Sequence, residues 1–170
     1  MAVNFSKAFD TVDHTALLGC LFKGSMDSNS IRWISSYLRG RTSSCSYNWK
    51  ESAWVHVQQG VPQGSVLFPA LFNYYVASYP HSTEKITSNA NDFMAFATDS
   101  QYDRAAAHLI RHAEEVCAWA QERNLVISAQ KSTVTLLTPQ TRTRPVVTMN
   151  GASFLVEPNR RILRVTFNPT

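Results

Sequence analysis

The stretch EKITSNANDFMAFAT, residues 84–98, decides how the rest of this chain is interpreted. Two strand-like runs, EKITS and FMAFATD, flank a short polar tip from Asn89 to Asp92, and this pattern predicts a β-hairpin. The tip holds a single carboxylate, Asp92, directly after an amide, Asn91. Such a composition fits an ordinary turn. It equally fits a metal site from which charge has been removed.

Helices are predicted on both sides of this hairpin from apolar residues spaced three and four apart. The segment at 28–38 has a Ser or Asn as its expected cap, and the segment at 65–79 accommodates Pro69 in its first turn. The strongest helical pattern runs from 100 to 124 and should cover one face of a sheet. Its apolar positions are Ala106, Leu109, Ile110, Ala113, Cys117 and Ala120, and a further helix is expected at 14–23.

The remaining segments favour strands and turns. Alternating residues predict a strand at 52–59 behind a basic turn at 38–48, and the segment 124–138 should end in a strand. Asn150-Gly151 predicts a second hairpin within 146–156, and another strand is expected near the chain's end at 161–170. Because helices interleave with hairpins, the pattern favours an α+β fold over a parallel doubly wound sheet.

Composition limits the function classes. The 170 residues suit one domain with a core, and the net charge of +4 would suit contact with phosphate groups. Three well-separated cysteines predict reduced thiols inside the cell, nuclear or cytoplasmic. No apolar stretch reaches the ~18 residues of a membrane span, so no membrane partner is expected. The abrupt start at Met1 suggests a truncated first strand.

Two residue clusters have spacing or charge that would suit other chemistry. His108 and His112 lie four apart on the predicted long helix, as zinc-binding histidines do, but no glutamate lies between them and no third ligand is evident. We expect a solvated or half-buried pair instead. The second group is a set of arginines that would suit a phosphate track: Arg39, Arg41, Arg142, Arg144, Arg160, Arg161 and Arg164.

Three blocks in order carry a family resemblance: NFSKAFDTVDH at 4–14, GVPQGSVLFPALF at 60–72 and NANDF at 89–93. Together with WISSYLRGRT, LVISAQKS and RILRVTF, they resemble the reverse transcriptase (RNA-directed DNA polymerase) of non-LTR, LINE-type retrotransposons. The resemblance covers nearly the whole chain. It implies a polymerase palm, with an antiparallel sheet backed by helices, part of the fingers and no thumb.

The resemblance also implies a two-metal nucleotidyltransferase site. Its Mg²⁺ ions, with Mn²⁺ as a possible substitute, need carboxylate ligands. The corresponding positions here are Asn4, Asn91 and Asp92, so two of the three ligands are amides. We expect metal binding to be weak or lost and the copy to be catalytically inactive. Whether the chain is an enzyme is left open by the sequence.

Other positions match the family's functional residues. Phe9 corresponds to an aromatic gate against the ribose 2′-OH, with a core phenylalanine as the alternative. Gly60, Pro62, Gln63 and Gly64 correspond to the loop that supports the template strand and the incoming nucleotide, and Lys131 corresponds to a proton donor for pyrophosphate. Three positions depart from the family pattern: Asn89, Phe68 and Arg164.

The sequence therefore predicts a reverse-transcriptase palm with partial fingers at 1–138 and the end of the palm, towards an absent thumb, at 139–170. The implied partners are an RNA template, a DNA primer and deoxynucleoside triphosphates; the oligomeric state is unknown. Two alternatives stay open: a nucleic-acid-binding remnant without catalysis, and a decayed reading frame without a selected function.

Overall fold

The computed structural model describes residues 1–82 and 85–135, and beyond them the backbone of five short strands. It divides into two compact units, which are described separately. The first comprises Met1–Ser6 and Tyr79–Thr170, and the second comprises Lys7–Ser78. Both contain helix and sheet, as an α+β fold requires, and the main sheet is largely antiparallel.

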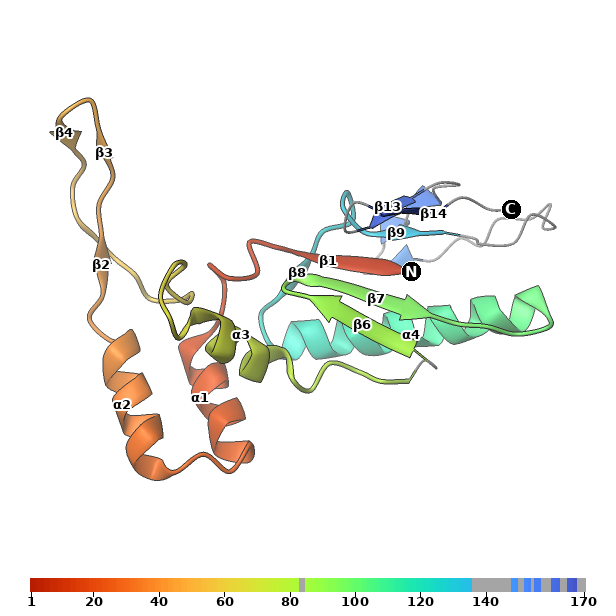
Figure 1. Ribbon diagram of the computed structural model, residues 1–170, viewed down its shortest axis with the longest axis horizontal. Coiled ribbons are helices and arrows are strands. Elements are labelled where there is room, and N and C mark those ends of the chain that lie inside the picture. Colours follow the sequence, from red (N-terminus) through yellow and green to blue (C-terminus); the bar gives the residue numbers. More distant parts are fainter. Residues whose placement is uncertain are drawn as a thin grey trace. The chain divides into compact units, whose positions relative to one another are not determined.

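The first unit is a sheet covered by one long helix (Figure 1). Its sheet has the strand order β12-β9-β1-β7-β6, with β8 also pairing with β1, and only the β12–β9 pair is parallel. Its elements are β1 (Ala2–Ser6), β6 (Lys85–Asn89), β7 (Asp92–Phe96), α4 (Tyr102–Glu122), β8 (Val126–Ile127), β9 (Thr133–Val134), β10 (Thr148–Met149), β11 (Ala152–Ser153), β12 (Leu155–Val156), β13 (Arg160–Ile162) and β14 (Val165–Phe167).

The predicted hairpins of this unit are present. β6 and β7 pair antiparallel on either side of Ala90 and Asn91, as the deciding stretch indicated. β10 and β11 pair on either side of Asn150-Gly151. The last predicted strand is instead a pair, β13 and β14, because the chain turns back within the segment.

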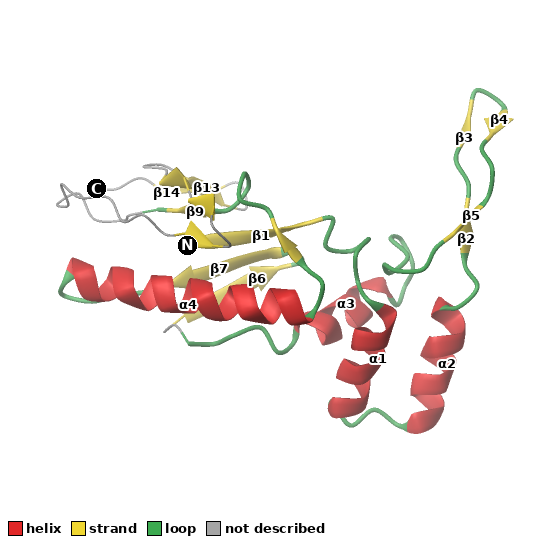
Figure 2. Ribbon diagram, turned by 180° about the vertical axis from the view of Figure 1, so that it is seen from behind, coloured by secondary structure: helices red, strands yellow, loops and turns green. Residues whose placement is uncertain are grey.

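Helix α4 runs along one face of the sheet (Figure 2). An aromatic cluster joins the helix to the sheet. Trp119 of α4 lies 5.9 Å from Phe5 of β1 and 5.3 Å from Tyr79, measured between ring centroids. Tyr79 in turn stacks on Phe93 of β7 at 4.2 Å. Sequence-distant segments are thus joined by the burial of large apolar rings.

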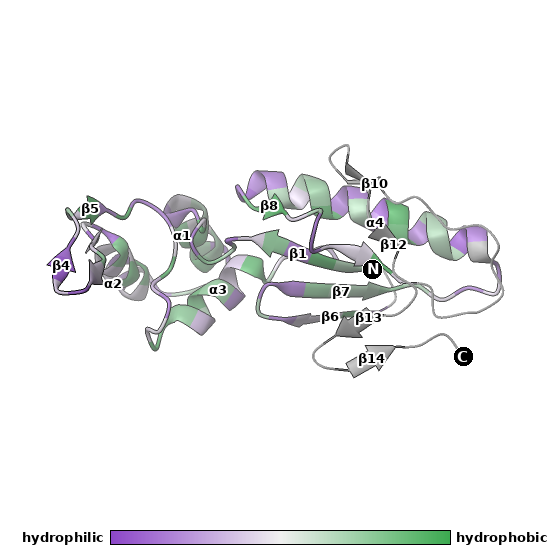
Figure 3. Ribbon diagram, turned by 90° about the horizontal axis from the view of Figure 1, so that it is seen from above, coloured by the Kyte–Doolittle hydropathy of each residue, from purple (hydrophilic) through white to green (hydrophobic). Residues whose placement is uncertain are grey.

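The buried face of α4 differs from the predicted one. Ala113 and Ala120 are buried as expected, but Ile110 is exposed and Cys117 only half-buried. The face that packs inward adds His112, Val116 and Trp119. The error arose because a histidine and a tryptophan were not counted as core residues, which shifted the inferred stripe around the helix. Figure 3 shows hydrophilic and hydrophobic residues alternating along α4.

The second unit contains three helices and a long two-stranded arm. The helices are α1 (His14–Lys23), α2 (Ser28–Leu38) and α3 (Phe68–Val76), and Pro69 occupies the first turn of α3 as predicted. The Asp13 carboxylate caps α1. The cap of α2 is Asp27, not a Ser or Asn, because its carboxylate accepts from the two backbone N–H groups of Asn29 and Ser30 at 3.0 Å.

The arm spans Thr42–His56 and corrects the prediction of a basic turn followed by one long strand. Its strands are β2 (Thr42–Ser43), β3 (Ser46–Tyr47), β4 (Lys50–Glu51) and β5 (Val55–His56). β2 pairs with β5 and β3 with β4, so the predicted turn is one half of a hairpin. Sequence patterning missed it because its strands are short and both faces are exposed.

The three cysteines, Cys20, Cys45 and Cys117, are thiols. In the part of the chain that the structure describes, no helix is both long enough and apolar enough to cross a membrane.

Candidate metal and nucleotide site

Of the three positions predicted to hold metal, Asn4 and Asp92 face each other on the first unit's sheet, and Asn91 precedes Asp92 at the hairpin tip. Asn4 of β1 lies directly across from Asp92, the first residue of β7, in the antiparallel ladder. Asn91 occupies the tip that precedes β7, and its side-chain amide donates to the Phe5 carbonyl at 3.4 Å. The tip's other residue, Ala90, has a φ of +54°. Residues more than 80 positions apart in the chain thus share one small region.

The Asn4 and Asp92 side chains contact each other directly. The Asn4 amide nitrogen Nδ2 donates a hydrogen bond to Oδ1 of Asp92. Because a carboxylate only accepts hydrogen bonds, the amide nitrogen and not its oxygen faces Asp92. The Asn4 Oδ1 atom is buried and has no hydrogen-bond partner among residues 1–82 and 85–135.

This arrangement does not fit a hard divalent cation. Mg²⁺ requires several converging oxygen ligands, whereas here an N–H group already occupies one carboxylate oxygen. No group of three His, Cys, Asp or Glu side chains that could hold a metal is found among the described residues. We therefore derive no catalytic step through a bound metal at this site.

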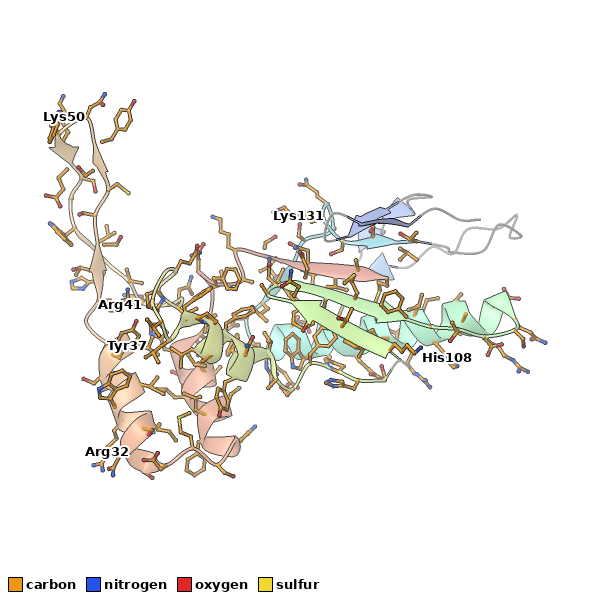
Figure 4. All side chains as sticks on the ribbon, in the orientation of Figure 1. Arg32, Tyr37, Arg41, Lys50, His108 and Lys131 are labelled. Carbon is orange, nitrogen blue, oxygen red and sulfur yellow. The ribbon has the colours of Figure 1, made fainter. Side chains whose placement is uncertain are left out.

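A turn between β8 and β9 braces the Asn4 backbone. The Ser132 hydroxyl accepts from the Asn4 backbone N–H at 3.0 Å, and the Ser128 N–H donates to the Asn4 carbonyl at 2.8 Å. Lys131 lies on this turn and its side chain is exposed (Figure 4). Ser132 was missed by the sequence analysis, since its role depends on pairing that a single sequence does not reveal.

The predicted nucleotide and template residues lie in the second unit. The Gly60 N–H donates to the Val12 carbonyl at 2.8 Å, and the Val61 N–H donates to the Phe9 carbonyl at 2.9 Å. Gly60 has a φ of +88°, and an added Cβ would come within 2.8 Å of the Asp10 carbonyl oxygen. The close approach of the two segments therefore requires glycine.

The next residues of this loop are more open. Gln63 is exposed and its amide Nε2 donates to the Asp10 carboxylate at 3.0 Å, a partner that sequence reasoning missed. Pro62 accepts from the Ser65 N–H through its carbonyl, at 3.1 Å. Gly64 also has a φ of +88°, but nothing lies within 4 Å of the position its Cβ would take.

Phe9, predicted as either a gate or a core residue, is half-buried against α3. Its ring lies 4.7 Å from that of Phe68 and 4.6 Å from that of Phe72, both edge to face. Phe68 is one of the residues that depart from the family pattern. Its ring therefore packs against Phe9, the residue predicted as the aromatic gate. The other described departure, Asn89, is exposed opposite Asp92.

The histidine pair does not form a zinc site. His108 is half-buried, as expected, but His112 is fully buried because its imidazole packs beside the buried Tyr79 ring. Its Nδ1 atom lies 2.8 Å from the Ser82 hydroxyl and its Nε2 atom 3.4 Å from the Tyr79 hydroxyl. Burial lowers the pKa of His112, with Glu115 acting in the opposite direction. Both ring nitrogens are thus occupied by hydroxyl groups.

The arginines of the predicted phosphate track are only partly described. Arg39 is exposed and Arg41 is half-buried, and both lie between α2 and the arm. The side chains of Arg142, Arg144, Arg160, Arg161 and Arg164 lie outside the described residues.

Comparison with known proteins supplies a family. The protein family described as "Reverse transcriptase (RNA-dependent DNA polymerase)" matches residues 1–160 of this chain. The RNA-directed DNA polymerase from mobile element jockey of Drosophila funebris is 28% identical over 88% of this chain, and that of Drosophila melanogaster 27% identical over 88%. The probable RNA-directed DNA polymerase from transposon X-element of Drosophila melanogaster is 28% identical over 85%.

These matches confirm the resemblance to the polymerases of non-LTR retrotransposons. The chain spans only 16–17% of the length of these relatives.

Proposed function

Because this chain belongs to the reverse transcriptase (RNA-dependent DNA polymerase) family, we propose that it is a fragment of such a domain in which catalysis has been lost. The ancestral reaction adds deoxynucleotides to a DNA primer on an RNA template inside the cell, using two Mg²⁺ ions. The observation that carries the loss is the hydrogen bond from the Asn4 amide to Asp92, at two of the family's three ligand positions.

The loss has a simple electrostatic basis. Asn4 and Asn91 replace two carboxylates, so the formal charge of the three ligand positions falls from −3 to −1. If each missing carboxylate costs ~3 kcal/mol of transition-state stabilisation, each slows the chemical step on the order of a hundredfold. The two losses together would take synthesis below detection.

The second unit supplies the proposed contacts to nucleotide and template. We assign these contacts to Gly60, Pro62, Gln63 and Gly64, because their loop is held against the segment that carries Phe9. In the first unit, Lys131 is assigned to the leaving pyrophosphate, since it is exposed on the turn that braces Asn4. We propose that residues 1–138 form the palm with partial fingers and that residues 139–170 form the end of the palm.

The test restores the missing charge. Mn²⁺ is titrated by calorimetry into the full chain and into the double variant Asn4→Asp with Asn91→Asp. We expect binding only by the double variant, because three carboxylates can then converge at the tip. Primer extension on an RNA template should likewise give no product with the unmodified chain.

A matched control separates site geometry from total charge. The variant Asn48→Asp with Asn124→Asp adds the same two charges at residues that match none of the family's ligand positions and should bind no Mn²⁺. Metal binding or primer extension by the unmodified chain would overturn the proposed loss. If the folded double variant did not bind Mn²⁺, the geometry of the three ligand positions, and not only their charge, would be lost.

A further inference from the structure

The second unit exposes an unusual set of aromatic side chains. Three of the four tryptophans lie between residues 33 and 54, and all are more than half exposed: Trp33 at 58%, Trp49 at 104% and Trp54 at 64%. Tyr47 in the same segment is 80% exposed. The fourth tryptophan, Trp119, is buried in the first unit. Large aromatic side chains left in water at this density mark a binding surface.

The arm that carries most of them has no core of its own. Within the part of the chain that the structure describes, its strands pair with each other alone, and all its residues except Ser44 are exposed. At its tip, Asn48 and Trp49 have φ values of 47° and 62°. A tight turn of this kind favours glycine at the second position. Trp49 is fully exposed and adopts a left-handed conformation, so it adds no buried apolar surface to the described residues and is a candidate for a role in binding.

Helix α2 continues the aromatic surface. Trp33 and Tyr37, one helical turn apart, stack with ring centroids 5.7 Å apart and planes within 6° of parallel. The Arg41 guanidinium carbon lies 5.7 Å from the centre of the Tyr37 ring, beyond the end of α2. Figure 4 shows Arg32 and Tyr37 on α2, Arg41 at the base of the arm and Lys50 at its tip.

The same segment is strongly basic. Residues 32–56 contain four cations, Arg32, Arg39, Arg41 and Lys50, against one carboxylate. That carboxylate, Glu51, accepts a hydrogen bond from the Ser44 hydroxyl at 2.7 Å. Cations and flat aromatic rings are thus interspersed along the sequence from α2 to the tip of the arm. Charge complementarity points to a polyanion, and the open ring faces point to unpaired bases.

We propose that α2 and the arm, residues 28–56, form a binding surface for single-stranded nucleic acid. Bases stack on the exposed rings of Trp33, Tyr47, Trp49 and Trp54, while the four cations contact the phosphates. Duplexes are disfavoured because their bases are already stacked on one another. The surface is independent of the metal site, so it serves a chain that has lost catalysis.

The test measures binding of fluorescein-labelled oligo-dT and oligo-rU of about 15 nucleotides to the full chain by fluorescence anisotropy. Trp49→Ala should weaken binding at least about fivefold, the smaller end of what one stacked base contributes. Arg41→Gln should reduce the dependence of log affinity on log salt by about 0.7, one phosphate contact to a single strand. Bound oligonucleotide should also quench tryptophan emission.

Two control variants lie in the same unit outside the surface. Phe22→Ala removes an exposed ring from α1, and Lys23→Gln removes an exposed cation. Both should bind as the unmodified chain does. The Asn4→Asp with Asn91→Asp variant should bind the single strand unchanged, which separates this proposal from the proposed loss of catalysis.

Several results would overturn the proposal. They are the absence of binding at ~50 mM salt, equal losses with Trp49→Ala and Phe22→Ala, and equal affinity for a duplex of the same length. If Trp49→Ala instead abolished self-association seen by sedimentation and left oligonucleotide binding intact, the surface would be a protein interface.

Discussion

Gly60 and Gly64 share one backbone conformation but lie in different surroundings, which allows strain to be separated from packing. Both have a φ of +88°, but only at Gly60 would a Cβ meet backbone atoms, those of Asp10. We expect Gly64→Ala to cost about 1 kcal/mol for the left-handed conformation alone. Gly60→Ala should cost roughly 1–3 kcal/mol more, because the chain must move apart. Urea unfolding of the two variants checks this, and equal losses would contradict it.

His112 predicts how stability depends on pH. Burial lowers its pKa in the folded chain, so between the folded and unfolded pKa values the unfolded chain binds more protons. The free energy of unfolding should therefore be highest above the unfolded value of about 6.5 and should fall as pH drops below it. His112→Gln should flatten this slope. If the free energy of unfolding of His112→Gln depended on pH as steeply as that of the unmodified chain, groups other than His112 would cause the dependence.

At the scale of elements, Trp119 decides how α4 packs on its sheet. Its ring contacts Phe5 and Tyr79, so Trp119→Ala should lower the free energy of unfolding by roughly 3–5 kcal/mol. Ile110 is the matched control on the same helix, since it is exposed although the sequence pattern placed it inside. Ile110→Ala should change stability by less than about 0.5 kcal/mol. If denaturant titrations showed similar losses of unfolding free energy for Trp119→Ala and Ile110→Ala, Ile110 would belong to the buried face, as the sequence pattern predicts.

Most elements could be predicted because their signals are local. The β6–β7 hairpin follows from two strand-like runs around a turn, and Pro69 marks the start of α3. The buried face of α4 was misjudged because burial of His112 depends on hydroxyl partners, one of them Ser82, contributed by another segment. The arm was predicted only in part: alternation indicated a strand at 52–59, which contains β5, but β2 and β3 are two residues long and exposed, so their segment resembled a turn.

At the scale of the whole molecule, the position of the candidate site was predictable only through the family blocks. Nothing local indicates that Asn4 pairs with Asp92, because that register is set by β1 and β7 far apart in sequence. The sequence also does not predict that the Asn4 amide nitrogen, rather than its oxygen, faces Asp92, since this orientation depends on the carboxylate across the ladder. The blocks predict the ligand positions, and the hydrogen bond from the Asn4 amide to Asp92 is a physical reason why the side chains there do not fit a dication.

The distribution of packing predicts which parts of the chain open first. β1 and β7 lie inside the sheet and carry Phe5 and Phe93 of the aromatic cluster, whereas the arm is a two-stranded ribbon without a core. Amide hydrogen exchange should therefore be slowest in β1 and β7 and fastest in the arm, since an isolated hairpin is only marginally stable in water. Mass spectrometry of peptic peptides measures this. Adding oligo-dT should slow exchange in the arm and leave β1 and β7 unchanged, because stacked bases would hold the tip around Trp49 in one conformation. Strong protection of the arm in the free chain would instead mean that the arm is ordered without a ligand.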